Sequence, residues 1–191
     1  MQDQLAAEAE IVCRKARQED FGPASELLNR YHVDRLGPEQ RRDGFISALF
    51  TPAQLREMAE EIGVFVAVSR GQVLACLCCY DSASPALPPP YRTMSAHFDA
   101  WLFRGRALSA WRCFAYGPVC IDVPARGKGV LRRLFTTMLP EVRQRYQAGT
   151  AFVAKDNPRS LAAHIDQLGM APVGEFSHDG QAFVALAFIV D

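Results

Sequence analysis

Short continuous runs of apolar residues alternate along this chain with stretches in which apolar residues recur at helical spacing. The continuous runs have the length of β-strands, and the longest of them are typical of strands covered on both faces. A two-residue turn of Arg70 and Gly71 joins two of these runs into a hairpin. We predict strands at 11–17, 64–69, 73–80, 113–123, 150–154, 172–176 and 183–190.

Helices are predicted where apolar spacing and end signals agree. Asp20 begins the first helix, which its carboxylate can cap. Thr51–Pro52 and Asn157–Pro158 are pairs of an N-cap residue followed by a first-turn proline, and each starts a further helix. The predicted helices cover 20–31, a segment within 39–50, 51–63, 94–102, 130 onward with a kink or restart at Pro140, and 157–169.

Two interruptions stand out in this pattern. Gly117 and Pro118 fall inside the predicted strand 113–123, and because proline cannot donate to a ladder, this strand should separate locally from a neighbour. The segment 81–112 loses regular periodicity, and its prolines exclude a central strand. The apolar face predicted within it, made of Met94, Phe98, Trp101 and Leu102, either packs in the core or lines a pocket.

Composition narrows the class of protein. The 191 residues suit a single domain, and the 21 basic and 21 acidic residues give no overall field toward nucleic acid or an anionic membrane. The chain has neither a membrane-spanning run nor a signal-peptide pattern, so a cytoplasmic protein is expected. Its six cysteines lie in apolar, strand-like runs, which favours buried, reduced thiols over disulfides or a metal site.

The stretch PARGKGVL, residues 124–131, joins a predicted strand to a predicted helix. A glycine-rich turn at a helix start presents unpaired backbone N–H groups at the positive end of the helix dipole, which is an anion site. Gly127 and Gly129 permit positive φ, and Arg126 and Lys128 add charge. The alternative interpretation is a solvated basic turn.

Other phosphate motifs do not fit this stretch. In a P-loop alignment Asp122 replaces the first glycine and Gly129 replaces the Ser or Thr, and in a dinucleotide fingerprint Arg132 replaces the third glycine. Arg126, Lys128, Arg132 and Arg133 have no interleaved aromatic residues, so nucleic-acid binding is not expected.

The element order, together with VPARGKGVLRRLF and NPRSLAAHIDQLGM, resembles the GNAT superfamily of acyl-CoA-dependent N-acyltransferases over nearly the whole chain. The family signature is Arg or Gln, two residues, Gly, one residue, then Gly or Ala. Arg126 and Gly129 match it, whereas Leu131 stands at its third position and crowds the approach. The resemblance implies one α/β (α+β) domain over 1–191: a mixed, mostly antiparallel central sheet of about seven strands, flanked by helices and splayed between the fourth and fifth strands.

The resemblance further implies acetyl-CoA as acyl donor, with its pyrophosphate on the loop 126–131 and its pantetheine arm along the backbone of Ile121 and Val123. Asn157 is either a cofactor contact, an N-cap or both, and Ser160 either a cofactor contact or a first-turn polar residue. The expected acetyl-CoA-binding residues are Ile121, Asp122, Val123, Arg126, Gly127, Lys128, Gly129, Val130, Leu131, Asn157 and Ser160.

For catalysis, backbone N–H groups at Cys120 and Ile121 are expected to polarise the acyl carbonyl. His164 occupies the place where the family often has a tyrosine acid, in a segment one residue longer than usual; it is either the general acid or a partly buried helix residue. Tyr116 or a water chain would serve as base, and Asp122 is more plausibly structural. A covalent route through Cys120 is disfavoured, because an apolar strand raises a thiol pKa.

The expected activity is direct acetyl transfer to a primary amine of an unidentified small molecule or peptide, without a metal. The alternative is a non-catalytic acyl-CoA-binding or sensor module, which Leu131 and the lack of a strand glutamate favour. The insertion at 81–112 is expected near the acceptor, where Tyr91, His97, Phe98 and Trp101 would form an aromatic wall or part of the core. The oligomeric state is open, with a homodimer as one option.

Overall fold

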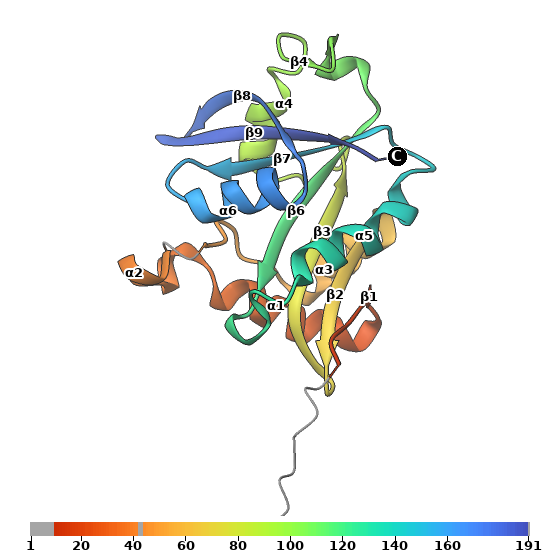
Figure 1. The fold of residues 1–191 in the computed structure, drawn as a ribbon, viewed down its shortest axis with the longest axis vertical. Coiled ribbons are helices and arrows are strands. Elements are labelled where there is room, and N and C mark those ends of the chain that lie inside the picture. Colours follow the sequence, from red (N-terminus) through yellow and green to blue (C-terminus); the bar gives the residue numbers. More distant parts are fainter. Residues whose placement is uncertain (1–9, 42–43, 191) are drawn as a thin grey trace, which may run out of the picture.

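The computed structural model describes residues 10–41 and 44–190. Its strands are β1 (Val12–Lys15), β2 (Gly63–Ser69), β3 (Gln72–Asp81), β4 (Leu102–Phe103), β5 (Arg106–Ala107), β6 (Cys113–Ile121), β7 (Ala148–Ala154), β8 (Ala171–His178) and β9 (Gln181–Ile189). Seven of these form one sheet in the order β1-β2-β3-β6-β7-β9-β8, and β4 and β5 form a separate hairpin (Figure 1). All neighbours in the large sheet are antiparallel except β6 and β7, which confirms the predicted mixed sheet.

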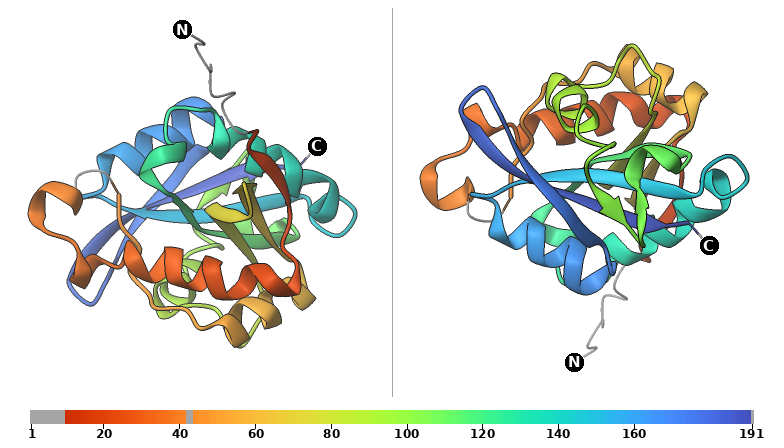
Figure 2. Two further views of the ribbon diagram at one scale, coloured as in Figure 1. Left: turned by 90° about the horizontal axis from the view of Figure 1, so that it is seen from below. Right: turned by 90° about the horizontal axis from the view of Figure 1, so that it is seen from above.

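Helices cover both faces of this sheet. They are α1 (Phe21–Arg30), α2 (Pro38–Arg41), α3 (Pro52–Glu61), α4 (Pro89–Ser95), α5 (Val130–Val142) and α6 (Pro158–Ala162), which continues into a π-helical turn at Ala163–Gln167. Figure 2 shows α1 and α3 on one side and α5 and α6 on the other. The sheet therefore separates two apolar cores, one around Leu27, Leu55 and Cys78, the other around Phe65, Leu134 and Phe188.

The fourth and fifth strands of the sheet diverge soon after they meet. β6 pairs with β7 only at Cys113, Phe114 and Ala115. Beyond these pairs Gly117 adopts a φ of 110°, and the register of β6 against β3 shifts between Leu77 and Cys79. The local separation predicted from Gly117 and Pro118 is confirmed, and it leaves one edge of β6 without a strand partner among the described residues.

Gly149 occupies the middle of the three β6–β7 pairs that precede this divergence. It pairs with Phe114 on β6 and with Phe188 on β9. A Cβ atom placed on Gly149 would overlap the ring of Phe188 and lie 2.9 Å from Cε1 of Phe114. The two rings can therefore approach this closely only because residue 149 has no side chain. Their packing holds β6 and β7 together at one end, while the strands separate at the other.

We expect Gly149→Ala to lower the free energy of unfolding by about 1–3 kcal/mol, because overpacking a close-packed core forces side chains and backbone to shift. Gly37→Ala is the matched control: Gly37 is exposed, and a Cβ there meets only Gln40 at an ordinary 3.7 Å. Denaturant unfolding of both variants measures the difference. Equal midpoints for the two variants would contradict this account of the junction.

Most predicted elements are present, with corrections at three helices. Asp20 does not cap α1; its carboxylate accepts from the Arg14 guanidinium at 2.5 Å and from the Arg17 N–H at 2.7 Å, which closes a 3-10 turn before the helix. The helix expected within 39–50 is only the short α2, since Gly44 has a φ of 106° and Ile46 instead forms a bridge with His32.

The third correction concerns the insertion. In place of the helix predicted over 94–102, the structure has α4 at Pro89–Ser95. This helix begins earlier because prolines in the first turn of a helix lose no hydrogen bond and favour a helix start. Leu102, predicted on its buried face, is 66% exposed in β4.

All six cysteines are free thiols as predicted, buried except for the half-buried Cys13. Within residues 10–41 and 44–190, no helix is both long and apolar enough to cross a membrane.

Candidate active site

The glycine turn connects the open strand to a helix start. β6 ends at Ile121, a 3-10 turn spans Val123–Ala125, and α5 begins at Val130. Gly127 and Gly129 have φ values of 74° and 69°, which confirms the predicted positive φ. A Cβ at either position would meet no atom within 4 Å, so backbone conformation rather than crowding within the chain requires glycine there. The turn leaves bare backbone at the positive end of the α5 dipole.

Arg126 and Asp122 fix this turn to the rest of the molecule. The Arg126 Nε donates to the Ile121 carbonyl at 3.0 Å, and its guanidinium lies 5.2 Å from the ring centre of Tyr31. Asp122 accepts from the Tyr31 hydroxyl at 2.6 Å and from Arg30 Nη1 at 3.0 Å. Asp122 therefore ties the end of α1 to the strand that precedes the turn, in keeping with the structural role expected for it.

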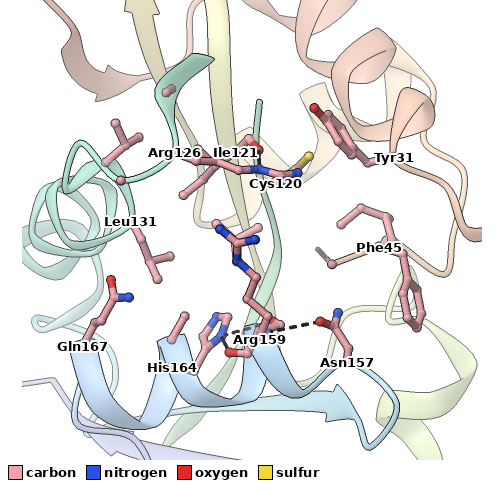
Figure 3. Close-up of a pocket in the computed structure, with 18 of the residues that line it drawn as sticks. Tyr31, Phe45, Cys120, Ile121, Arg126, Leu131, Asn157, Arg159, His164 and Gln167 are labelled. Atoms are coloured by element: carbon pink, nitrogen blue, oxygen red, sulfur yellow. Dashed lines mark hydrogen bonds between the residues drawn. The ribbon is translucent and has the colours of Figure 1, made fainter. Parts of the chain in front are cut away.

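A cavity of about 420 Å³ opens between this turn, the free edge of β6 and α6 (Figure 3). Eight of the expected acetyl-CoA-binding residues line it: Ile121, Arg126, Gly127, Gly129, Val130, Leu131, Asn157 and Ser160. Asp122, Val123 and Lys128 are not among its lining residues, and Val123 is 61% exposed. The cavity thus extends from the glycine turn to the point where β6 leaves β7.

The direction of the β6 backbone groups follows from one hydrogen bond. The Asp122 N–H donates to the Leu74 carbonyl on β3. Because N–H groups alternate between the two edges of a strand, the Cys120 N–H also points to β3, whereas those of Ile121 and Val119 point to the open edge. Of the two backbone groups expected to polarise an acyl carbonyl, only that of Ile121 points to the open edge, and the Val119 N–H points there as well.

Asn157 begins α6 and is buried. Its Oδ1 accepts from the Ser160 N–H at 3.2 Å, so it is an N-cap as predicted. A Cβ on Gly44 would lie 3.7 Å from the same Oδ1, so the loop between α2 and α3 packs directly over this amide. The cap and a ligand contact are compatible, since Asn157 also lines the cavity.

His164 lies further along the same helix, in the π-helical turn. A π turn holds one residue more than an α turn. The Nδ1 of His164 is 2.7 Å from the Ser160 carbonyl oxygen and must donate to it, which leaves the Nε2 lone pair available. Burial lowers the pKa of His164, an effect that the bond to Ser160 offsets in part. The ring is therefore neutral near pH 7 and suited to accept a proton before it donates one.

Tyr116 and Cys120 are poor candidates for ionised groups. Burial and the nearby Cys79 raise the pKa of Tyr116 well above its ordinary value, and the Tyr116 hydroxyl has no hydrogen-bond partner among the described residues. Its ring packs edge to face on His164, with centroids 5.6 Å apart. Burial also raises the pKa of the Cys120 thiol, and the nearby Cys76 raises this pKa further. Burial thus disfavours the ionised form of both side chains, and the Tyr116 ring packs against His164; a role of Tyr116 as base stays a prediction.

A second cavity, of about 440 Å³, lies on the other side of the divergence. Residues from α4, from the loop before α3 and from the β8–β9 turn close it. Both cavities are lined by Phe45, Ile46, Val119, Asn157, Ser160 and His164. His164 therefore stands where a ligand in the first cavity and a ligand in the second would meet.

The insertion contributes less to this cavity than the sequence suggested. Tyr91 lines it, together with the prolines that start α4, whereas His97, Phe98 and Trp101 do not. Trp101 packs on the backbone of Gly174 in β8, where a Cβ would overlap its indole, and His97 stacks on Trp101 at 5.1 Å. These side chains anchor the insertion to the sheet edge.

Several lining residues were not nominated from the sequence. Figure 3 shows the guanidinium of Arg159 extending from α6 across the cavity toward β6, and Gln167 and Tyr31 at its rim. Arg159 directly follows the Asn157–Pro158 cap pair, a signal that could have identified it. Phe45 and Tyr31 carried no signal, because only the packing of the segment before α3 brings them to the site.

Among the residues described, no three His, Cys, Asp or Glu side chains are grouped as metal ligands would be.

Comparison with solved structures identifies the fold. No protein-family model matches the sequence, and no curated protein sequence matches it. The structure is similar to an N-acetyltransferase from Staphylococcus aureus Mu50 (TM-score 0.62, 16% identity, 96% of this chain and 100% of that chain). It is also similar to an acetyltransferase of the GNAT family from Streptococcus pneumoniae (0.63, 12%, 95% and 100%) and to a putative acetyltransferase from Salmonella typhimurium with its cofactor acetyl-CoA (0.60, 14%, 95% and 94%). This protein has the fold of the GNAT acetyltransferases.

Proposed function

We propose that this protein is an N-acetyltransferase that transfers an acetyl group from acetyl-CoA directly to a primary amine. The observation that carries the proposal is the meeting of two cavities at His164, at the point where β6 leaves β7. A module that only binds an acyl-CoA needs the first cavity. The second cavity, which shares His164 and Asn157 with the first, favours an enzyme with an acceptor site.

The first cavity has the features that acetyl-CoA requires. The backbone of Gly127 and Gly129, at the start of α5, would hold the pyrophosphate, and Arg126 and Arg159 line the same cavity with positive charge. The pantetheine arm would lie along the unpaired edge of β6. The N–H groups of Ile121 and Val119 would then face the thioester, where an oxyanion forms.

The reaction follows from the neutral state of His164. A neutral amine attacks the thioester carbonyl carbon, and the negative charge that develops on the carbonyl oxygen is stabilised by the β6 N–H groups. His164 Nε2 accepts the proton that the nitrogen loses, the C–S bond breaks, and the imidazolium returns that proton to the CoA thiolate. A buried imidazolium is a strong donor, because burial disfavours its charge. His164 would thus act first as base and then as the acid expected from the sequence.

Initial rates of thiol release over a grid of acetyl-CoA and amine concentrations test this proposal. We expect a sequential pattern, with double-reciprocal lines that intersect, and Cys120→Ala should preserve it because the thiol takes no part. Parallel lines that Cys120→Ala abolishes would establish a covalent route instead. Tight acetyl-CoA binding without turnover on any amine would favour the non-catalytic module.

A further inference from the structure

The second cavity is lined mainly by rings and aliphatic surface. Seven phenylalanine and tyrosine residues from six parts of the fold line it: Phe45, Phe50, Tyr80, Tyr91, Tyr116, Phe152 and Phe183. The Tyr91 hydroxyl is already bonded to Thr150 Oγ1 at 2.6 Å, so this end of the cavity presents the ring rather than a free polar group. Phe152 and Phe183 pack edge to face, 5.3 Å apart, and form a continuous apolar wall.

Few titratable side chains line this cavity. Among the described residues that line it there is no lysine, arginine or glutamate, and the titratable groups other than the tyrosines are His164, His178 and Asp179. His178 is held by Thr93 Oγ1 at 2.8 Å and lies 3.4 Å from the Asp179 carboxylate, which is at the solvent-exposed β8–β9 turn. The cavity therefore offers no lysine or arginine to an anionic ligand, and the only carboxylate among the described residues that line it lies at the rim.

We propose that the acetyl acceptor is a small primary amine with an apolar, preferably aromatic, body and no carboxylate or phosphate. This rests on the proposed acetyl transfer and names the substrate class of the same site. A volume of about 440 Å³ is that of a small-molecule pocket rather than a protein-docking surface.

Two physical effects favour such an acceptor. A carboxylate in this cavity would lose its hydration without gaining a cationic partner, which is costly. The same apolar surroundings disfavour an ammonium ion, so an amine that enters deprotonates more readily and arrives at His164 as the nucleophile that the reaction needs. The apolar walls thus have two effects: they disfavour ligands that carry a carboxylate, and they favour the neutral, nucleophilic form of the amine.

The test compares matched pairs on the full chain with saturating acetyl-CoA: L-phenylalaninol against L-phenylalanine, and hexylamine against 6-aminohexanoate. Each pair differs by the carboxylate. We expect kcat/KM to be at least about tenfold higher for the member without the carboxylate, the ratio that a buried polar group left without a partner produces. Calorimetric titration of the same four compounds into the CoA-saturated chain gives a readout that does not require turnover.

A variant sharpens the comparison. Ser47 is exposed and lines the cavity, so Ser47→Arg adds a cation at its wall while Ser47→Gln adds a shorter polar side chain without charge. Ser47→Arg should narrow the discrimination against 6-aminohexanoate, and Ser47→Gln should leave it unchanged.

The outcomes separate this inference from the proposed function. Turnover that prefers the carboxylate-bearing members, spermidine or a peptide N-terminus overturns the inference and leaves acetyl transfer standing. Preferential binding of the apolar amines without turnover supports the inference and contradicts the proposed function. Absence of binding and turnover for all four compounds overturns the inference.

Discussion

Replacing His164 with glutamine is expected to lower kcat by about 10²–10⁴-fold, the range in which a positioned general base contributes. Glutamine can keep the hydrogen bond to the Ser160 carbonyl, but it has no lone pair of suitable basicity to replace Nε2. The affinity for acetyl-CoA should change little, because His164 lies at the inner end of the first cavity, away from the glycine turn. Steady-state kinetics at saturating amine, with calorimetric titration of acetyl-CoA, separate the two effects.

The pH dependence provides a second readout. A base with a lowered pKa is active in its neutral form, so wild-type kcat should stay constant near neutral pH and fall only as the pH drops through a value below the ordinary histidine pKa of about 6.5. His164→Gln should remove this acidic limb. His97→Gln is the control, since His97 is exposed, stacks on Trp101 and lines neither cavity. If His164→Gln kept both kcat and the acidic limb, His164 would have no role as base.

Replacing Gly129 with valine should weaken acetyl-CoA binding by about 10- to 150-fold, the effect of losing one hydrogen bond to a charged group. Gly129 begins α5 with φ 69°, a conformation that a β-branched residue strongly disfavours. If the backbone at position 129 of this variant moved to a more favourable φ, the N–H groups of the turn would rotate away from the pyrophosphate. The isopropyl group would also occupy the approach to the cavity. Arg126→Ala should also weaken binding, because it releases the turn from Ile121 and Tyr31.

Gly71→Val is the matched control for Gly129→Val. Gly71, in the β2–β3 turn, has a φ of 77°, and a Cβ there also meets nothing within 4 Å. Both valines impose a similar backbone strain, about 1–2 kcal/mol or more, so both variants should lose similar stability in thermal unfolding. Only Gly129→Val should lose acetyl-CoA affinity, measured by calorimetry. Equal affinities in the two variants would remove the glycine turn from the binding site.

Much of the fold could be read from local chemistry. The Thr51 and Asn157 caps and the hairpin turn at Gly71 each depend on a few neighbouring residues, and all are present in the structure. The predictions that failed depended on competition between distant groups. The Asp20 carboxylate bonds to Arg14 on β1 instead of capping α1. The apolar residues predicted on one helix over 94–102 divide between α4 and the segment that follows it, where Trp101 packs on Gly174.

The sequence by itself determined the conformation of the glycine turn and the site at which β6 leaves β7. Two glycines at positive φ and a Gly–Pro pair constrain the backbone locally, whatever surrounds them. The tertiary structure alone decided what His164 can do. Its neutral state requires burial, its free Nε2 requires the Ser160 carbonyl, and its place between two cavities requires β6, α6 and the loop before α3 to pack together. Burial and cavity shape are produced by residues far apart in the chain, so no local pattern encodes them.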